Sequence, residues 1–168
     1  MVAALLAALI AMAEPTAVPA WRLTPAGLGP VRIGMNRDQV AKALKTELEG
    51  EAFDNEGSCI ELFPQSEELK GSYFMFLDGK LSRISVTDPN KIVTPRGIGV
   101  GATADDVRKA YGPKLEAEEH HYSGAPAEYL TYWLKPKARG VRFETDANGK
   151  VDIIHAGNDS IQYVEGCA

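Results

Sequence analysis

VRIGMNRDQVAKAL, at positions 31–44, decides the fold, because it returns as IGVGATADDVRKAY at positions 98–111. The two stretches match at a constant offset of 67 residues. Five positions are identical in the two copies. In the first copy they are Gly34, Asp38, Val40, Lys42 and Ala43. Self-similarity at a fixed period is the signature of a repeat architecture. The sequence therefore predicts two copies of one small unit.

Each copy predicts a short strand, a glycine turn and a helix. Asn36 is a favourable N-cap for a helix over residues 37–48, whose apolar residues recur at spacings of three and four and so share one face. In the second copy Thr103 is the cap, and Asp106 completes a capping box. Gly112-Pro113 then ends that helix.

Alternating, strand-like sequence follows each predicted helix. Residues 59–63 match residues 129–133 at an offset of 70, and DGK at 78–80 matches NGK at 148–150 at the same offset. Asp-Gly and Asn-Gly between alternating runs are strong signals for a β-hairpin. Each unit therefore reads as strand, helix and three antiparallel strands, and residues 161–164 suggest a last edge strand.

One helix per unit can cover only one face of such a sheet. We therefore expect an α+β protein in which two tandem helix-plus-antiparallel-sheet repeats form a curved sheet with helices on one face. The expected units are residues 21–90 and 91–168, and the linker between them spans residues 88–96, which include Pro89 and Pro95.

The N-terminus has the features of a signal peptide. Residues 1–13 are a short apolar run that ends in Ala11-Met12-Ala13, a small-x-small cleavage pattern, although no Lys or Arg precedes the run. The run is far shorter than the roughly 20 apolar residues that span a bilayer. We expect a signal peptide within residues 1–20, cleaved after Ala13 or Ala20, and a periplasmic or secreted protein without a membrane span. A buried N-terminal helix is the alternative, but the run has no polar face.

Charge argues against two classes of partner. The chain of 168 residues has a formal net charge of −5, whereas a protein that neutralises phosphates needs a basic face. Lys and Arg are also scattered along the sequence, so no basic patch is predicted for an anionic membrane surface.

The two cysteines, Cys59 and Cys167, predict a disulfide in an exported protein. Such a bond would tie the first repeat to the last residues of the second. Neither cysteine has a His or Cys close by in the sequence, so the spacing does not fit a metal site. Two free buried thiols are the alternative if the protein is not exported.

Several short motifs in tandem order carry a resemblance to a known family. They are Ile33-Gly34-Met35, Asp38, Val40, Asp78-Gly79-Lys80, Val100-Gly101, Asp105, Val107 and Asn148-Gly149-Lys150. From about Gly27 to Cys167 the chain resembles the beta-lactamase inhibitory protein-like superfamily, whose relatives include small outer-membrane lipoproteins of the SmpA/BamE type. Residues 163–167 also resemble the close of exported proteobacterial proteins with this layout.

The resemblance implies a curved sheet whose concave face binds another protein. Members do not share one function, and a fold alone does not supply one. The single cysteine pair departs from the within-repeat bonds of the named inhibitor, and no cysteine follows the apolar run, unlike in the lipoproteins. No inhibitory target is therefore carried over.

The three histidines are the candidates for catalysis or metal binding. His120-His121 follows Glu118-Glu119 and could bind zinc, but adjacent residues on a strand point to opposite sides, and a solvated loop is the alternative. His155 alternates with Ile154 and Ala156 and is expected on the open side of the sheet. Because no nucleophile elbow, HExxH, P-loop or dinucleotide motif is present, we predict no catalytic residue, metal or cofactor.

The sheet face away from the helices is the stronger candidate site. Alternate residues along a strand point to the same face of the sheet. One such set suits the core and consists of Ile60, Leu62, Leu130, Tyr132 and Leu134. The opposite parity and its neighbours give the expected binding residues, which are Phe63, Tyr73, Met75, Arg83, Tyr129, Thr131, Trp133 and His155. Tyr and Trp are enriched among interface hot spots. A reversed parity, or a loop that covers these residues, is the alternative.

We therefore expect an exported, non-catalytic module that binds an envelope or extracellular protein through the concave sheet face, as an inhibitor or a scaffold. The alternative is a metal-dependent or hydrolytic envelope enzyme that uses His120, His121 and His155. A third hypothesis is a protein that holds a small apolar ligand between sheet and helices.

Overall fold

The computed structural model describes residues 21–50, 52, 57–136 and 138–167. The expected signal peptide, within residues 1–20, lies outside the described residues. Within the described part of the chain, no helix is both long enough and apolar enough to cross a membrane.

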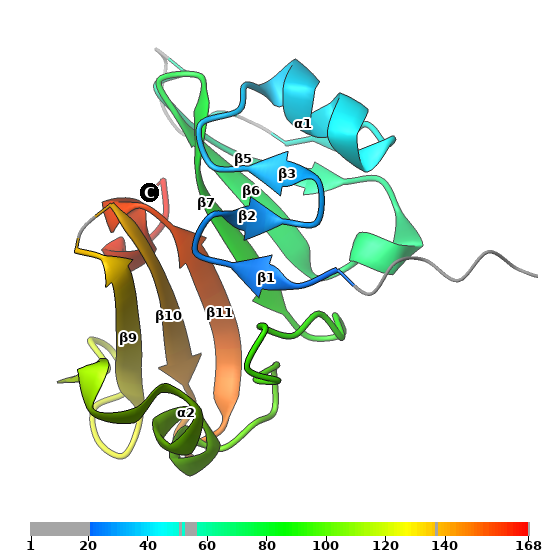
Figure 1. The fold of residues 1–168 in the computed structure, drawn as a ribbon. Helices are drawn as coiled ribbons and strands as arrows, with labels where there is room; N and C mark the ends of the chain where they lie inside the picture. Colours follow the sequence, from blue (N-terminus) through cyan, green and yellow to red (C-terminus); the bar gives the residue numbers. More distant parts are fainter. Residues whose placement is uncertain (1–20, 51, 53–56, 137, 168) are drawn as a thin grey trace, which may run out of the picture.

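An antiparallel sheet of eight strands dominates the structure (Figure 1). The strand order across the sheet is β4-β5-β6-β7-β11-β10-β9-β8. The strands are β4 (Leu48–Glu49), β5 (Cys59–Pro64), β6 (Ser72–Leu77), β7 (Lys80–Thr87), β8 (Leu115–Glu119), β9 (Glu128–Lys135), β10 (Arg139–Thr145) and β11 (Val151–Gly157). The pairing of β7 with β11 joins the two halves of the chain into one sheet.

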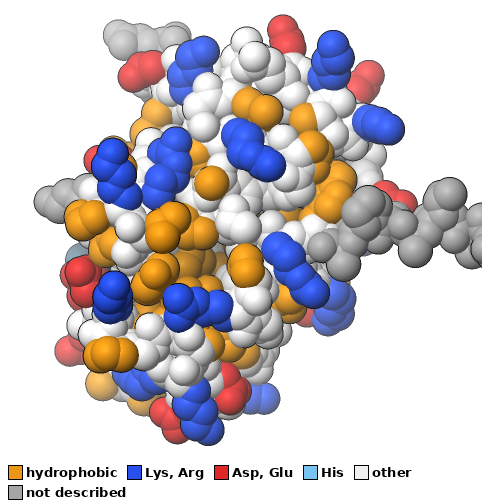
Figure 2. Space-filling model, viewed as in Figure 1, with side chains coloured by type: hydrophobic (Ala, Val, Ile, Leu, Met, Phe, Trp, Pro, Cys, Tyr) orange, Lys and Arg blue, Asp and Glu red, His pale blue; other side chains and the backbone are white. Residues whose placement is uncertain are grey.

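Shorter elements pack on one face of this sheet. They are a sheet of β1 (Leu23–Thr24), β2 (Gly27–Leu28) and β3 (Val31–Arg32), and the helices α1 (Arg37–Leu44) and α2 (Ala104–Tyr111). The described part of the chain also contains the 3-10 turns η1 (Glu67–Leu69), η2 (Gly112–Lys114) and η3 (Asp159–Gln162). In Figure 1 the strands β1–β3 lie in front of β5–β7. Figure 2 shows this face, over which Lys and Arg side chains are spread rather than gathered.

The expected α+β class is wrong, because the chain is mostly β. In the residues that the structure describes, eleven strands form the two sheets, whereas α1 and α2 have only eight residues each. The helix predicted over 37–48 ends at Leu44, since Lys45 adopts a left-handed conformation with φ 57°. Leu48 and Glu49 then pair with β5 as an edge strand.

Two other segments differ from the expectation. Residues 115–119 form β8, which pairs with β9, although no strand was predicted there. Residues 161–164, suggested as a last edge strand, contain the end of η3, then Tyr163 in an extended conformation, and then a turn that begins at Val164. The unit boundaries 21–90 and 91–168 stay a prediction. In each half a helix precedes four strands of the large sheet.

Both predicted helix caps are confirmed. The Asn36 side chain accepts a hydrogen bond from the Gln39 backbone N–H, and the Gln39 side chain accepts one from the Asn36 backbone. Thr103 and Asp106 form the same capping box at α2. Such boxes satisfy amide donors that have no partner within the helix.

The hydrophobic core lies between the large sheet and the elements on its covered face. Phe74, Ile84 and Phe143 from the sheet are fully buried there, as is Val107 from α2. The expected core parity holds for Leu62 and Leu130, which are buried, and for Ile60 and Tyr132, which pack against the core. The prediction that Leu134 belongs to the core is wrong, because this residue is 64% exposed. It lies just past Trp133, where an irregularity shifts the pairing of β9 with β10.

The C-terminal residues cross the other face of the sheet. We call residues 158–167 the strap. The predicted disulfide between Cys59 and Cys167 is confirmed and ties the end of the strap to β5 across 108 residues of sequence. Ser160 and Ile161 of the strap are buried, and η3 packs against β7, β10 and β11. The sheet face opposite the helices is therefore partly covered by the chain itself.

Candidate functional site

The register of the sheet sets two rows of side chains on the face under the strap. Each row consists of residues that are direct partners on neighbouring strands. The first row is Tyr73, Ser85, His155, Arg142, Thr131 and Glu116. The second row is Thr87, Ile153, Glu144, Tyr129 and Glu118.

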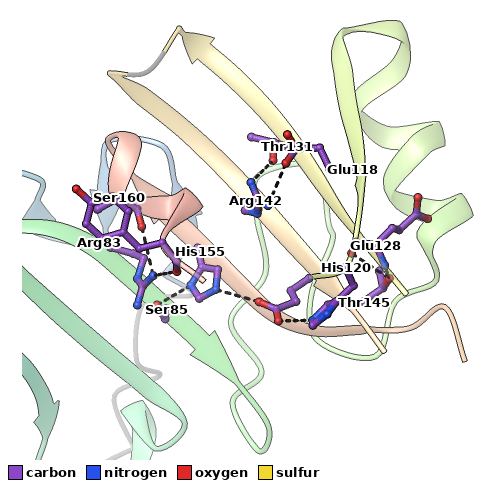
Figure 3. Close-up of polar contacts among 12 residues, drawn as sticks. Arg83, Ser85, Glu118, His120, Glu128, Thr131, Arg142, Thr145, His155 and Ser160 are labelled. Atoms are coloured by element: carbon purple, nitrogen blue, oxygen red, sulfur yellow. Dashed lines mark hydrogen bonds and ion pairs between the residues drawn. The ribbon is translucent and has the colours of Figure 1, made fainter. Parts of the chain in front are cut away.

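Two histidines share one carboxylate at the centre of this face (Figure 3). His120 Nε2 lies 2.7 Å from Glu144 Oε1, and His155 Nε2 lies 3.5 Å from Glu144 Oε2. His155 Nδ1 lies 2.8 Å from Ser85 Oγ. A proton on Nε2 of His155 suits the carboxylate and leaves Nδ1 to accept the Ser85 hydroxyl proton.

Burial sets the charge state of His155, whereas hydrogen bonds and charge set that of Glu144. Burial lowers the pKa of His155 to about 4, helped by the charges of Arg83 and Arg142 and opposed by Glu144. Burial alone would raise the pKa of Glu144, but hydrogen bonds and charge from His155 and His120 outweigh it and lower that pKa. At neutral pH His155 is therefore neutral and Glu144 is ionised.

We expect acid to destabilise the protein through His155. The folded pKa of about 4 lies below the unfolded value of 6.5, so the unfolded state binds the proton more readily. The stabilisation is present above about pH 6.5 and is lost as the pH falls toward 4. The lowered pKa of Glu144 acts in the same direction at the acid end. From pH 7 to 4.5 the unfolding free energy should fall by about 2 kcal/mol from His155 alone, measured by urea unfolding.

The matched pair for this prediction is His155→Gln and His121→Gln, because His121 is exposed. His155→Gln should flatten the pH dependence between pH 6.5 and 4.5, whereas His121→Gln should leave it unchanged. Equal pH slopes in the two variants would contradict the assignment to His155.

The contacts from Ser85 to His155 and from His155 to Glu144 resemble those of a catalytic triad, in which a serine contacts a histidine and the histidine contacts a carboxylate. Ser85 is fully buried in the middle of the sheet, however, so a substrate carbonyl cannot reach its hydroxyl. A base with a pKa of about 4 is also weak at neutral pH. These contacts order the sheet rather than activate a nucleophile.

The metal hypothesis receives no geometric support from the described residues, which contain no group of three His, Cys, Asp or Glu side chains placed to hold an ion. His120 points to Glu144, and its neighbour His121 is exposed and makes an edge contact with Tyr122. The two adjacent histidines therefore do not converge.

Tyr129, expected as a displayed aromatic, is buried under a stack of side chains. The His120 ring stacks on the Tyr129 ring at 4.7 Å between centroids, and the Arg142 guanidinium lies 4.0 Å from the same ring centre. Arg142 also donates to Glu118 at 3.1 Å. With only 4% of its surface exposed, Tyr129 has little area to offer a partner.

Arg83 joins the sheet to the strap. Its Nη1 donates to the carbonyl of Tyr163 at 2.9 Å and to that of Ser160 at 3.3 Å, and its Nη2 donates to Glu61 at 2.7 Å. The side chain is almost fully buried, and its Nε has no hydrogen-bond partner among the described residues. Arg83 is thus a central support of the strap.

The eight expected binding residues differ in exposure. Phe63 is exposed, and Tyr73 and Trp133 are half-buried. The buried members are Met75, Arg83, Tyr129, Thr131 and His155. The strap, together with the stack on Tyr129, limits access to this face.

Two cavities lie beside the strap and share Val164, Glu165 and Gly166. One, of about 580 Å³, is also lined by His121, Tyr122 and Tyr163, and by residues at the disulfide. The other, of about 330 Å³, is the strap cavity, lined by Glu61, Phe63, Tyr73, Arg83, Glu144, Ile153, His155 and the shared residues.

Exposed apolar side chains gather around these cavities. Five large hydrophobic residues of the described chain are exposed, and four of them line one cavity or both: Phe63, Tyr122, Tyr163 and Val164. We call these four the strap patch. The last three were not predicted from the sequence, although the predicted Cys59–Cys167 bond requires residues 158–166 to return across the sheet.

Comparison with protein-family models, with curated proteins and with solved structures found no match for this chain. The resemblance to the beta-lactamase inhibitory protein-like superfamily therefore stays a prediction.

Proposed function

We propose that this protein is a non-catalytic protein-binding module and that the strap patch is its binding surface. The observation that carries the proposal is the position of the exposed apolar side chains. Four of the five lie beside two adjacent cavities, and Leu134 is the one that lies elsewhere. Gathered apolar side chains with a polar surround are typical of interaction sites.

The patch is also held in place before any partner arrives. The disulfide fixes the C-terminal end of the strap, Ser160 and Ile161 are buried against the sheet, and Arg83 binds the carbonyls of Ser160 and Tyr163. Tyr122 donates to Glu165 and connects its own loop to the strap. A surface that is already ordered loses less conformational entropy on binding.

We further propose that the protein is exported and acts in the periplasm or as a secreted protein, on an envelope or extracellular partner. The disulfide supports an oxidising compartment. The apolar run at residues 1–13 supports export. Inhibition and scaffolding would both use the same surface.

Site-specific photo-crosslinking in the exporting cell tests the proposal. A benzophenone amino acid replaces Tyr163 or Tyr122 within the patch, and Leu134, 64% exposed, is the matched control outside it. We expect one shared adduct from the two patch positions and none from position 134. The same adduct from all three positions, or no adduct from the patch, would contradict the proposal.

The captured protein is then purified and titrated with the Phe63→Ala and Tyr163→Ala variants. Each should weaken binding about tenfold or more, because truncation of a central aromatic commonly removes at least that much affinity. Unchanged affinity in both variants would place the interface elsewhere.

A further inference from the structure

Strand β8 is an edge of the large sheet. Among the strands that the structure describes, it pairs with β9 alone. Its residues are exposed except for Leu115, which is half-buried. The opposite edge is β4, which has only two residues. Because an edge strand presents backbone N–H and C=O groups that can pair with another chain, β8 is the longer of the two edges on which a further strand could pair.

Hydrogen bonds near the end of β8 show which of its backbone groups point outward. In an antiparallel pair, hydrogen-bonded and non-hydrogen-bonded residue pairs alternate, and in the latter the backbone groups point away from the partner strand. The His120 N–H, just past β8, donates to the Ala127 carbonyl at 3.0 Å. Glu128, which lies opposite Glu119, directs its N–H and C=O to the Thr145 hydroxyl instead of to β8. The outward-pointing backbone groups of β8 therefore belong to Leu115, Ala117 and Glu119.

These outward groups form a row that a strand could match. The Leu115 N–H donates to the Gly112 carbonyl. The Leu115 C=O and both backbone groups of Ala117 and Glu119 have no hydrogen-bond partner in the ranges that the structure describes. They recur at every second residue, which is the spacing at which neighbouring strands bond. A helix, whose backbone groups are already bonded within it, would not match this row.

A cavity of about 340 Å³, which we call the β8 cavity, adjoins the same strand. Its apolar lining comes from Pro126 and three alanines, and the rest comes from Glu118, Glu119 and Glu128. It shares no lining residue with the two cavities beside the strap. When a strand is added to a sheet edge, backbone hydrogen bonds supply affinity and pockets for alternate side chains supply specificity. The β8 cavity offers such a pocket.

The charges along β8 favour a basic side chain in this pocket. Glu118 and Glu128 each pair with an arginine of the same chain. Glu116 and Glu119 form no ion pair within the described part of the chain. The aliphatic stem of a lysine or arginine can cover small apolar residues while its charged end stays at a carboxylate. The carboxylate of Glu119 is therefore the one available to a basic side chain in the β8 cavity.

The charges also exclude occupants from the chain itself. The sequence of β8 is LEAEE, so pairing of two copies through β8 would bring their glutamates together, and like charges on paired strands are destabilising. Pairing with β4 of a second copy would add Glu49. Residues 1–20 contain no Lys or Arg to neutralise this edge. A basic segment from another protein is the occupant that these charges favour.

We propose that β8 is a second interaction surface, at which an extended basic segment of a partner protein adds a strand to the sheet and places a lysine or arginine side chain in the β8 cavity at Glu119. This surface is separate from the strap patch and extends the proposed function to a partner of defined backbone conformation and charge.

An NMR titration of the disulfide-bonded protein tests the proposal with synthetic peptides. The probe is acetyl-TVRVRVT-amide. The analogue with every backbone amide N-methylated keeps the charge but cannot donate to a strand, and acetyl-TVEVEVT-amide keeps the strand pattern but reverses the charge. We expect saturable shifts at residues 115–119 and 125–128, with affinity for the probe about tenfold or more above either control.

Amide exchange within β8 provides an internal control. At saturation with the probe, exchange should slow at Ala117 and Glu119, whose N–H groups point outward. The N–H groups of Glu116 and Glu118 already face β9, so their exchange should change little. Equal slowing at all four residues would indicate a general stabilisation and would overturn strand addition.

Variants with matched controls locate the contacts. Glu119→Gln should weaken binding of the probe about threefold, as expected for one exposed ion pair, whereas Glu67→Gln, at an exposed carboxylate beside Lys70, should leave it unchanged. Ala117→Pro removes an outward N–H without removing a bond to β9, as an edge strand tolerates, and should weaken binding about tenfold or more.

Two results would overturn the inference. Equal affinity for the probe and its N-methylated analogue would mean that charge attraction alone accounts for the binding. Shifts confined to the strap patch or to other surfaces would mean that β8 takes no strand. Crosslinking at Tyr163 does not involve β8, so the binding function of the strap patch and the β8 surface are accepted or rejected by separate experiments.

Discussion

Replacement of Arg83 by methionine is expected to lower the free energy of unfolding by about 3–5 kcal/mol, the cost of removing one partner from a buried ion pair. Only 3% of the Arg83 side chain and 14% of the Glu61 side chain are exposed, so the carboxylate would be left with little solvent. The carbonyls of Ser160 and Tyr163 would also lose their donor. Urea unfolding at pH 7 measures the change.

Two controls separate the buried pair from a general loss of charge. Arg83→Met combined with Glu61→Leu should recover part of the loss, since it removes the uncompensated carboxylate. Lys70→Met breaks a pair whose side chains are 62% and 90% exposed, and should change stability by less than about 0.5 kcal/mol. A similar small effect at Arg83 would show that the strap does not depend on it.

The second large effect is expected from the disulfide. The Cys59→Ser, Cys167→Ser variant should lose up to about 4.7 kcal/mol of unfolding free energy, the chain-entropy value for a loop of about one hundred residues. Here the bonded cysteines are 108 residues apart. Thermal and urea unfolding of the oxidised protein and of the variant measure the difference.

Reduction of the bond provides the control within the same sequence. Dithiothreitol should lower the stability of the natural chain to that of the serine variant and should leave the variant unchanged. Oxidised and serine proteins of equal stability would contradict the prediction. In the variant, amide exchange should be fastest at residues 163–167, because most of these residues are exposed and near the released end.

Local signals in the sequence were sufficient for the turns and caps. Asn36 and Thr103 cap their helices, and the hairpins predicted at 78–80 and 148–150 connect β6 to β7 and β10 to β11. Each of these features is decided by a few neighbouring residues, so a short window contains the information.

Elements that depend on distant partners were not predictable in the same way. The LEAEE segment of β8, at residues 115–119, has low β-propensity and becomes a strand because the edge of β9 is available to it. The early end of α1 depends on Lys45 in a left-handed conformation, which is uncommon for a residue other than Gly or Asn. Together these misses produced the wrong α+β class.

The alternation of residues along the strands identified the side chains on the sheet face opposite the helices, but not whether that face is exposed. Alternation placed Tyr129, Thr131 and His155 on one side, and the register agrees. Their burial arises from the strap and from His120 and Arg142, which come from other parts of the sequence. No local pattern distinguishes a covered sheet face from an open one.

The strap determines how early in synthesis the proposed binding surface can form. Phe63 comes from the first half of the chain, whereas Tyr122, Tyr163 and Val164 come from the second, and Arg83 can bind the strap carbonyls only after residues 160–163 have been made. The bond between Cys167 and Cys59 also links the two halves of the chain. A chain that lacks the strap therefore cannot form the strap patch, and the proposed binding would require both halves of the chain.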